Sequence, residues 1–264
     1  SGLWLERSPD QTEPHQMAPV ATPSAQATVS TDAQSYLLRQ PEAGPAAATE
    51  AEVPEAELRV GLTEGPVKGP DDALQRLLEG NARFRRGQPL RPNTGMDRLP
   101  QVASGQSPFA VVVCCSDSRV PPEIVFDRGI GDLFIVRTAG HVLDSAALAS
   151  VVYAVEELAT PLVLVLGHTQ CGAVHAALQD GNAPEYLRSV VRAIRRSLDA
   201  ADHLSGSRWD NVARVHVART AERIRATLAT EATSLHASSV RVVGAMYDTS
   251  TGEVTLVPDD VGQL

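Results

Sequence analysis

The chain has 264 residues, a formal net charge of −9 and three cysteines, which suits one sizeable α/β domain with a tail. The acidic balance argues against a nucleic-acid partner, because phosphate binding needs a basic face, and so few cysteines argue against a disulfide framework. No run of residues approaches the roughly 18 apolar positions of a membrane-spanning helix.

Residues 1–69 read as a separate acidic tail or linker. They are rich in Pro, Ala, Thr, Gln and Glu, and ten acidic against four basic residues account for −6 of the net charge. Their apolar residues show no sustained helical or strand period, so we expect disorder here and a folded domain over residues 70–264. Because the chain opens without Met, a membrane-tethered parent protein stays open as an alternative.

The first part of the domain alternates helices with short apolar strands. A helix capped by Asp71 or Asp72 and ending at Gly87 is followed by strand-like runs at 109–114, 133–136 and 162–166. Between the last two runs, residues 144–158 have the apolar spacing of a helix.

The second part continues with helical patterns at about 173–179, 184–200 and 208–230. Two final strands, at 240–247 and 254–257, flank a Ser250-Thr251-Gly252 turn and are expected to form a hairpin. Strands that alternate with helices predict an α/β fold with a mostly parallel central sheet flanked by helices.

Two segments carry metal-binding residue types at the ends of predicted strands. Cys115 follows the first strand, while His168 and Cys171 follow the third within Gly167-His168-Thr169-Gln170-Cys171-Gly172. In such sheets, ligands gather beyond the carboxyl ends of the strands. Two thiols and an imidazole suit one zinc ion per subunit and leave a fourth position open for water, which favours catalysis over a structural role. Thiolate ligands also favour a reducing compartment, and we expect the cytoplasm.

Cysteine and histidine residues can also have structural roles with no metal bound. Cys114 is expected to be a core thiol, since consecutive strand residues point to opposite faces and only Cys115 then reaches the site. His141 is kept as a residue of the pocket, and His175 as a minor competitor for the metal.

Asp117 and Arg119 lie two and four residues after the first thiol. An Asp there is placed to accept a hydrogen bond from a water on the metal, and the Arg fork keeps that carboxylate ionised and aimed. The alternative is a plain surface ion pair of little energetic value.

These residues resemble the β-class carbonic anhydrases over roughly residues 71–257. The resemblance lies in the opening helix, the Cys-x-Asp-Ser-Arg segment, the Gly-His-x-x-Cys-Gly segment, and the stretches Gly131-Asp132-Leu133-Phe134 and Arg137-Thr138-Ala139-Gly140. Thr138 and His141 depart from the family's pattern, which often carries Asn at both places.

The resemblance implies reversible hydration of CO2 to bicarbonate and a proton by zinc-bound hydroxide. It implies that Cys115, His168 and Cys171 bind zinc and that Asp117 and Arg119 are the catalytic pair. It also implies a homodimer or tetramer, in which Gln106 and Tyr153 can reach across the interface. The residues that correspond to the substrate pocket are Gln106, Phe134, Ala139 and Tyr153.

Two other functions remain open on sequence grounds. A carbon disulfide or carbonyl sulfide hydrolase would resemble this family in fold and ligands. A non-catalytic zinc- or bicarbonate-sensing module of a transporter would need neither the open zinc position nor the Asp117–Arg119 pair.

Overall fold

The computed structural model describes residues 65–234 and 239–261. The tail expected over residues 1–69 therefore lies outside the described residues, apart from its last five. Within the described part, regular structure begins with helix α3 (Pro70–Arg85), next to the predicted start of the domain.

The described strands form one five-stranded sheet in the order β2-β1-β3-β4-β5. Neighbours among the first four are parallel, and β5 pairs with β4 as the predicted antiparallel hairpin. The mostly parallel α/β sheet is confirmed, and each predicted strand is found to within two residues at either end. The strands are β1 (Ala110–Cys115), β2 (Leu133–Thr138), β3 (Leu162–His168), β4 (Arg241–Tyr247) and β5 (Val254–Val257).

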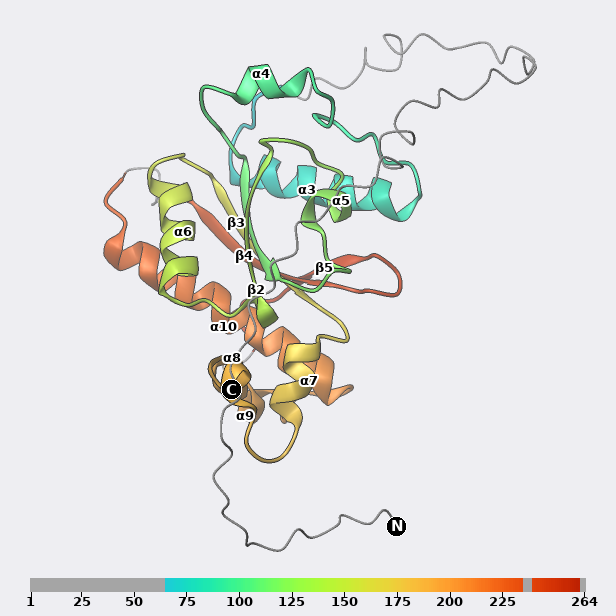
Figure 1. The fold of residues 1–264 in the computed structure, drawn as a ribbon, viewed down its shortest axis with the longest axis vertical. Coiled ribbons are helices and arrows are strands. Elements are labelled where there is room, and N and C mark those ends of the chain that lie inside the picture. Colours follow the sequence, from blue (N-terminus) through green and yellow to red (C-terminus); the bar gives the residue numbers. More distant parts are fainter. Residues whose placement is uncertain (1–64, 235–238, 262–264) are drawn as a thin grey trace, which may run out of the picture. The chain divides into compact units, whose positions relative to one another are not determined.

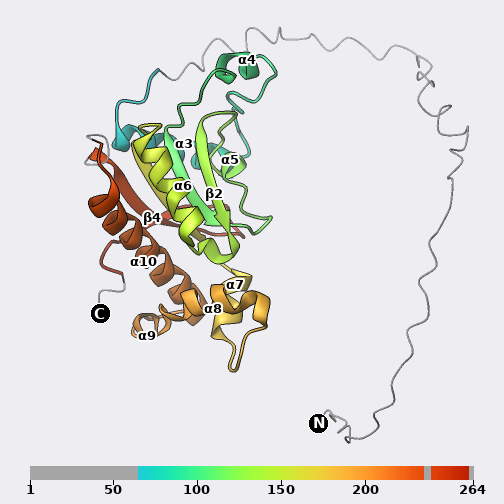
Figure 2. The same ribbon diagram turned by 60° about the vertical axis from the view of Figure 1, so that its left-hand side comes forward.

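Helices cover both faces of this sheet (Figures 1 and 2). Helices α6 (Ser145–Glu156) and α10 (Arg208–Glu231) pack on one face, and α3 packs on the other. The buried residues of β1 divide accordingly, because alternate side chains point to opposite faces. Val111, Val113 and Cys115 belong to the core under α6 and α10, while Val112 and Cys114 belong to the core under α3.

The first helix begins differently from the prediction. Pro70 is its first residue, a position where the missing N–H of proline has no cost, and Asp71 and Asp72 lie in the first turn instead of capping it. The carboxylate of Asp72 accepts the backbone N–H of Lys68 at 2.8 Å, so it holds the chain that leads into the helix. The helix ends at Arg85, two residues before the expected Gly87, which follows the C-cap with a φ of +67° that favours glycine.

The single helix predicted over residues 184–200 is wrong. The structure has a short turn η2 (Glu185–Leu187), then α8 (Arg188–Arg195), then α9 (Leu198–Ala201). At the break, the Ser197 N–H donates to the carbonyl of Ile194, three residues back, so the last turn tightens and the chain changes direction. Apolar spacing continues through such a break and does not reveal it.

The remaining elements are short. Helix α7 (Gly172–Leu178) follows β3 as predicted, and the turn η1 (Ala139–His141) follows β2. Helices α4 (Arg98–Val102) and α5 (Pro122–Val125) were not predicted, since four or five residues carry no periodic signal. None of the helices that the structure describes is long and apolar enough to cross a membrane.

Candidate metal centre

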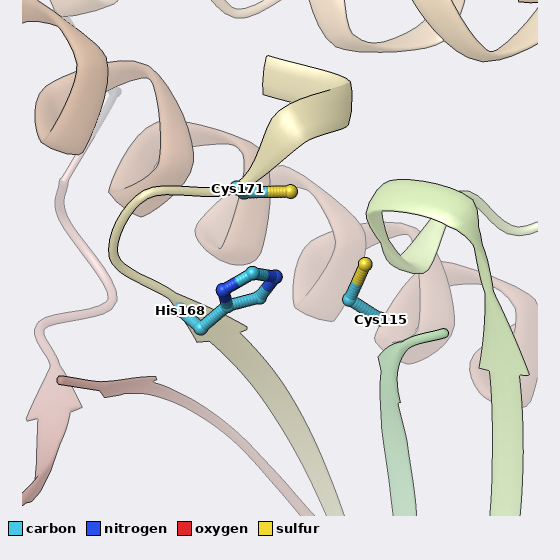
Figure 3. Close-up of side chains that lie close together, drawn as sticks. All are labelled: Cys115, His168 and Cys171. Atoms are coloured by element: carbon cyan, nitrogen blue, oxygen red, sulfur yellow. The ribbon is translucent and has the colours of Figure 1, made fainter. Parts of the chain in front are cut away.

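Three potential metal ligands converge at the carboxyl edge of the sheet. Cys115 is the last residue of β1, His168 is the last residue of β3, and Cys171 follows by one tight turn. Because β1 and β3 are neighbours, the strand ends bring the three side chains together (Figure 3). Their ligand atoms all lie within 4.8 Å of one another, in the one such group of His, Cys, Asp and Glu that residues 65–234 and 239–261 contain.

His168 presents one defined ring nitrogen to the two sulfurs. Its Nδ1 lies 2.9 Å from the carbonyl oxygen of Thr169 and donates to it, since a carbonyl only accepts. Nε2 therefore carries a lone pair, and it is buried with no hydrogen-bond partner among the described side chains and backbone. A buried, oriented nitrogen beside two thiols is the arrangement of a metal ligand.

Gly167 allows His168 to sit at this depth. A Cβ at residue 167 would lie 2.4 Å from Cγ2 of Val217 on α10 and 2.8 Å from the sulfur of Met246 on β4. Any larger residue would push β3 away from the helix that covers it, and the imidazole would move with the strand.

Cys115 accepts a hydrogen bond from the backbone N–H of Gly140 at 3.2 Å. A hydrogen bond from the Cys171 thiol, aided by His168 and by that N–H, lowers the pKa of Cys115, while the same pairing raises the pKa of Cys171. The two thiols therefore share one hydrogen bond, and a cation held by both sulfurs would displace its proton. Cys114 lies on the opposite face, where burial raises its pKa to about 12, and the choice between the two thiols is as predicted.

Two residues of α10 support the centre and were missed by sequence reasoning. The indole Nε1 of Trp209 donates to the carbonyl of Cys171 at 3.0 Å, and Nε2 of His216 donates to the carbonyl of Gly140 at 3.2 Å. Burial, and to a smaller extent the charge of Arg219, lower the pKa of His216 to about 4. No local sequence pattern identifies these two residues, because their hydrogen-bond partners lie 38 and 76 residues away in the chain.

Asp117 and Arg119 form the predicted pair. The guanidinium of Arg119 binds the Asp117 carboxylate through Nε at 2.9 Å and Nη2 at 2.8 Å, and its backbone N–H adds a third bond at 2.9 Å. The Arg119 side-chain bond is the main reason why the pKa of Asp117 falls to about 2. The carboxylate lies 3.9 Å from Nε2 of His168, so it borders the position between the three ligands.

Arg137 holds the loop that joins these groups, another role that the sequence did not assign. Its Nε donates to the carbonyl of Cys115 at 3.1 Å and its Nη2 donates to the carbonyl of Asp117 at 2.7 Å. From the other side, Arg119 Nη2 donates to the carbonyl of Gln170 at 3.1 Å, which ties the loop after β1 to the loop after β3.

The four expected pocket residues do not all meet within one chain. The rings of Phe134 and Tyr153 lie 6.4 Å apart, and Ala139 directly follows β2 beside the centre. Gln106 is exposed in the loop before β1, at the amino end of the strand whose carboxyl end carries Cys115. Six strand residues separate the two ends, a rise of about 20 Å.

The other histidines considered from the sequence stay outside the ligand group. His141 is buried, its ring packs on that of His216 at 4.6 Å, and its two nitrogens have no hydrogen-bond partner within the described structure. His175 packs against Trp209, with ring centroids 4.6 Å apart.

The donor set fits zinc. Two sulfurs and one imidazole nitrogen match its preferred ligands, and three protein ligands leave a tetrahedral ion one position open. The unpartnered Nε2 of His168, directed at the two sulfurs, is the observation that favours a metal over a buried hydrogen-bonded cluster.

Comparison with known proteins agrees with this site. The family described as carbonic anhydrase matches residues 110–254. The chain belongs to the β-class carbonic anhydrases. A carbonic anhydrase of Mycolicibacterium smegmatis is 42% identical over 205 residues, which make up 75% of this chain and 100% of that protein. Carbonic anhydrase 2 of Mycobacterium tuberculosis is 41% identical over 203 residues, covering 75% of this chain and 98% of that protein.

Solved structures of β-carbonic anhydrases have the same fold. The enzyme CafA of Aspergillus fumigatus superposes with a TM-score of 0.52 and 25% identity, over 73% of this chain and 94% of that one. The matched region of this β-carbonic anhydrase chain includes the candidate metal centre.

Proposed function

We propose that this chain catalyses the reversible hydration of CO2 to bicarbonate and a proton, with one zinc ion held by Cys115, His168 and Cys171. The observation that carries the proposal is the placement of the Asp117 carboxylate, 3.9 Å from the ligand nitrogen of His168 and fully engaged by Arg119. A structural zinc site would need a fourth protein ligand and no such pair.

Zinc bound here supplies Lewis acidity, which lowers the pKa of a water and makes a nucleophile available near neutral pH. The chain's own residues then orient that nucleophile. Asp117 is ionised and acts only as an acceptor, so it fixes the direction of the water's proton and leaves a lone pair for CO2. Arg119 holds Asp117 by two parallel bonds and thereby keeps it from turning onto the metal.

The substrate is proposed to lie against Phe134, Ala139 and Tyr153, with Gln106 supplied by a second subunit. An apolar wall suits CO2, which has no net charge, and an amide donor suits one of its oxygens. Tyr153 is 49% exposed in the single chain, which leaves its ring available to such an interface. A homodimer, alone or paired into a tetramer, would complete each site.

The domain of residues 70–264 is proposed to carry the whole activity, with residues 1–69 as a tail outside it. The paired thiolate ligands favour a reducing compartment, which supports a cytoplasmic location.

The Asp117→Asn variant tests the proposal. The amide keeps the size of the side chain but offers an N–H donor where an acceptor is needed, so we expect CO2 hydration to fall by about 100-fold or more while zinc stays bound. Stopped-flow hydration and metal analysis of the same preparations give both readouts. Stoichiometric zinc with near-normal turnover would remove Asp117 from the mechanism, and turnover of carbonyl sulfide in place of CO2 would change the substrate.

A further inference from the structure

A cavity lies between α8 and α10, and none of the three candidate metal ligands lines it. It has a volume of about 640 Å³, within the usual range for small-molecule sites. The loop after β2 forms one wall with Val142 and Leu143, and the rest comes from the end of α8 and the middle of α10.

The rim of this cavity is strongly basic. Arg196, Arg219 and Arg223 all line it, and the first two have no ion-pair or hydrogen-bond partner in the part of the chain that the structure describes. Nη1 of Arg223 donates a hydrogen bond to the carbonyl of Leu143 at 2.6 Å. The single acid at the rim is Glu222, which is 69% exposed and pairs with Arg225 at 3.2 Å.

The floor offers hydroxyl groups. Ser197 is fully buried at the break between α8 and α9, and its Oγ has no hydrogen-bond partner among residues 65–234 and 239–261. Its backbone is already satisfied, because its N–H donates to Ile194 and its carbonyl accepts from Ala201. Thr220, also buried, lines the same space. A buried hydroxyl without a partner is unfavourable unless something else binds it.

We propose that this cavity is a binding site for a small oxyanion, with phosphate or carboxylate groups, held by Arg196 and Arg219 at the rim and by the Ser197 hydroxyl at the floor. Guanidinium groups bind such oxygens by paired, charge-assisted bonds, and a hydroxyl donates to the same oxygens. The cavity holds no Cys and is separate from the zinc ligands.

One residue, His216, connects the cavity to the metal centre. His216 lines the cavity, and its Nε2 holds the carbonyl of Gly140, whose own N–H donates to the sulfur of Cys115. An anion bound in the cavity would therefore lie beside His216, the residue that holds the carbonyl of Gly140. This consequence rests on the proposed function, whereas binding itself does not.

Calorimetric titration of the full-length, zinc-loaded protein with inorganic phosphate, and in a second series with citrate, tests the proposal. Chloride keeps the ionic strength constant. We expect saturable binding of at least one anion, about tenfold weaker in Arg219→Gln and several-fold weaker in Ser197→Ala. The matched control is Arg192→Gln, which removes an exposed arginine of α8 outside this cavity and should bind as the wild type does.

Comparison of phosphate with citrate shows whether the cavity prefers phosphate or carboxylate groups. Selenate, an oxyanion that scatters anomalously, shows in crystals where the anion binds. A peak between Arg196, Arg219 and Ser197 supports the site. Absence of binding by either anion would overturn the proposal, and so would binding that both cavity variants leave unchanged, since the anion would then sit at the metal. Neither readout depends on CO2 hydration, so failure here leaves the proposed activity untouched.

Discussion

Cys114 and Cys115 show how one position along a strand decides the chemistry of a side chain. Both thiols are buried, yet only Cys115 faces His168 and Cys171, while Cys114 packs under α3. The difference arises from strand geometry, because consecutive side chains leave the sheet on opposite sides. Residue type and burial are the same, so neither property identifies the ligand.

This comparison makes a prediction with a built-in control. We expect Cys115→Ser to weaken zinc binding by more than about 100-fold, because a hydroxyl is a far poorer zinc ligand than a thiolate. Cys114→Ala should keep stoichiometric zinc and lose only some stability through a small cavity. Competition with a chromogenic chelator measures both. Equal zinc retention by the two variants would contradict the assignment of Cys115.

At the scale of elements, α10 connects distant parts of the centre. It packs along β3 and β4 and carries Trp209 to the carbonyl of Cys171 and His216 to the carbonyl of Gly140. Gly140 has a φ of +61°, and a Cβ there would lie 2.9 Å from Cδ1 of Ile194 on α8. The turn after β2 is therefore held by its neighbours on both sides, which fixes the N–H that Cys115 accepts.

The buried His216 predicts a loss of stability in mild acid. Its pKa is about 4 in the folded protein and near 6.5 when unfolded, so its contribution is fully present above pH 6.5 and is lost as the pH falls toward 4. Between pH 7 and pH 5, this one group should reduce the free energy of unfolding by about 2 kcal/mol.

Denaturant unfolding at the two pH values checks this prediction. His216→Gln keeps a donor for Gly140 but does not titrate, so its stability should change less between pH 7 and pH 5 than that of the wild type. His203→Gln, at an exposed position, is the control and should behave as the wild type. Identical pH dependence in all three proteins would show that His216 does not contribute.

At the scale of the whole molecule, the position of Gln106 argues for assembly. It lies at the amino end of β1, about 20 Å along the strand from Cys115, so one chain cannot bring it to its own metal centre. In a dimer with twofold symmetry, each subunit would supply Gln106 to the other's site.

Complementation between two variants tests this arrangement. Gln106→Ala and Asp117→Asn homodimers should each be poorly active, but a mixed dimer contains one site with both wild-type residues. In the purified mixed dimer, one of the two sites should then be active, which is about half of the wild-type activity. Co-expressed variants, separated by affinity tags and assayed by stopped flow, give the measurement. Unchanged low activity in the purified mixed dimer would place Gln106 in its own chain or outside the site.

Short-range patterns in the sequence were enough to predict the sheet, the Cys-His-Cys cluster and the Asp117–Arg119 ion pair. Apolar runs marked the parallel strands, and the candidate metal ligands stood at or just after strand ends, where an α/β sheet gathers its functional groups. The pairing of Asp117 with Arg119 followed from a separation of two residues.

Only the tertiary structure decided what surrounds these groups. The bond from Gly140 to Cys115 and the supports from Arg137, Trp209 and His216 join segments 22 to 76 residues apart in the chain. Apolar spacing shows which face of a helix packs on the sheet, but it does not show which side chain or carbonyl that face meets there.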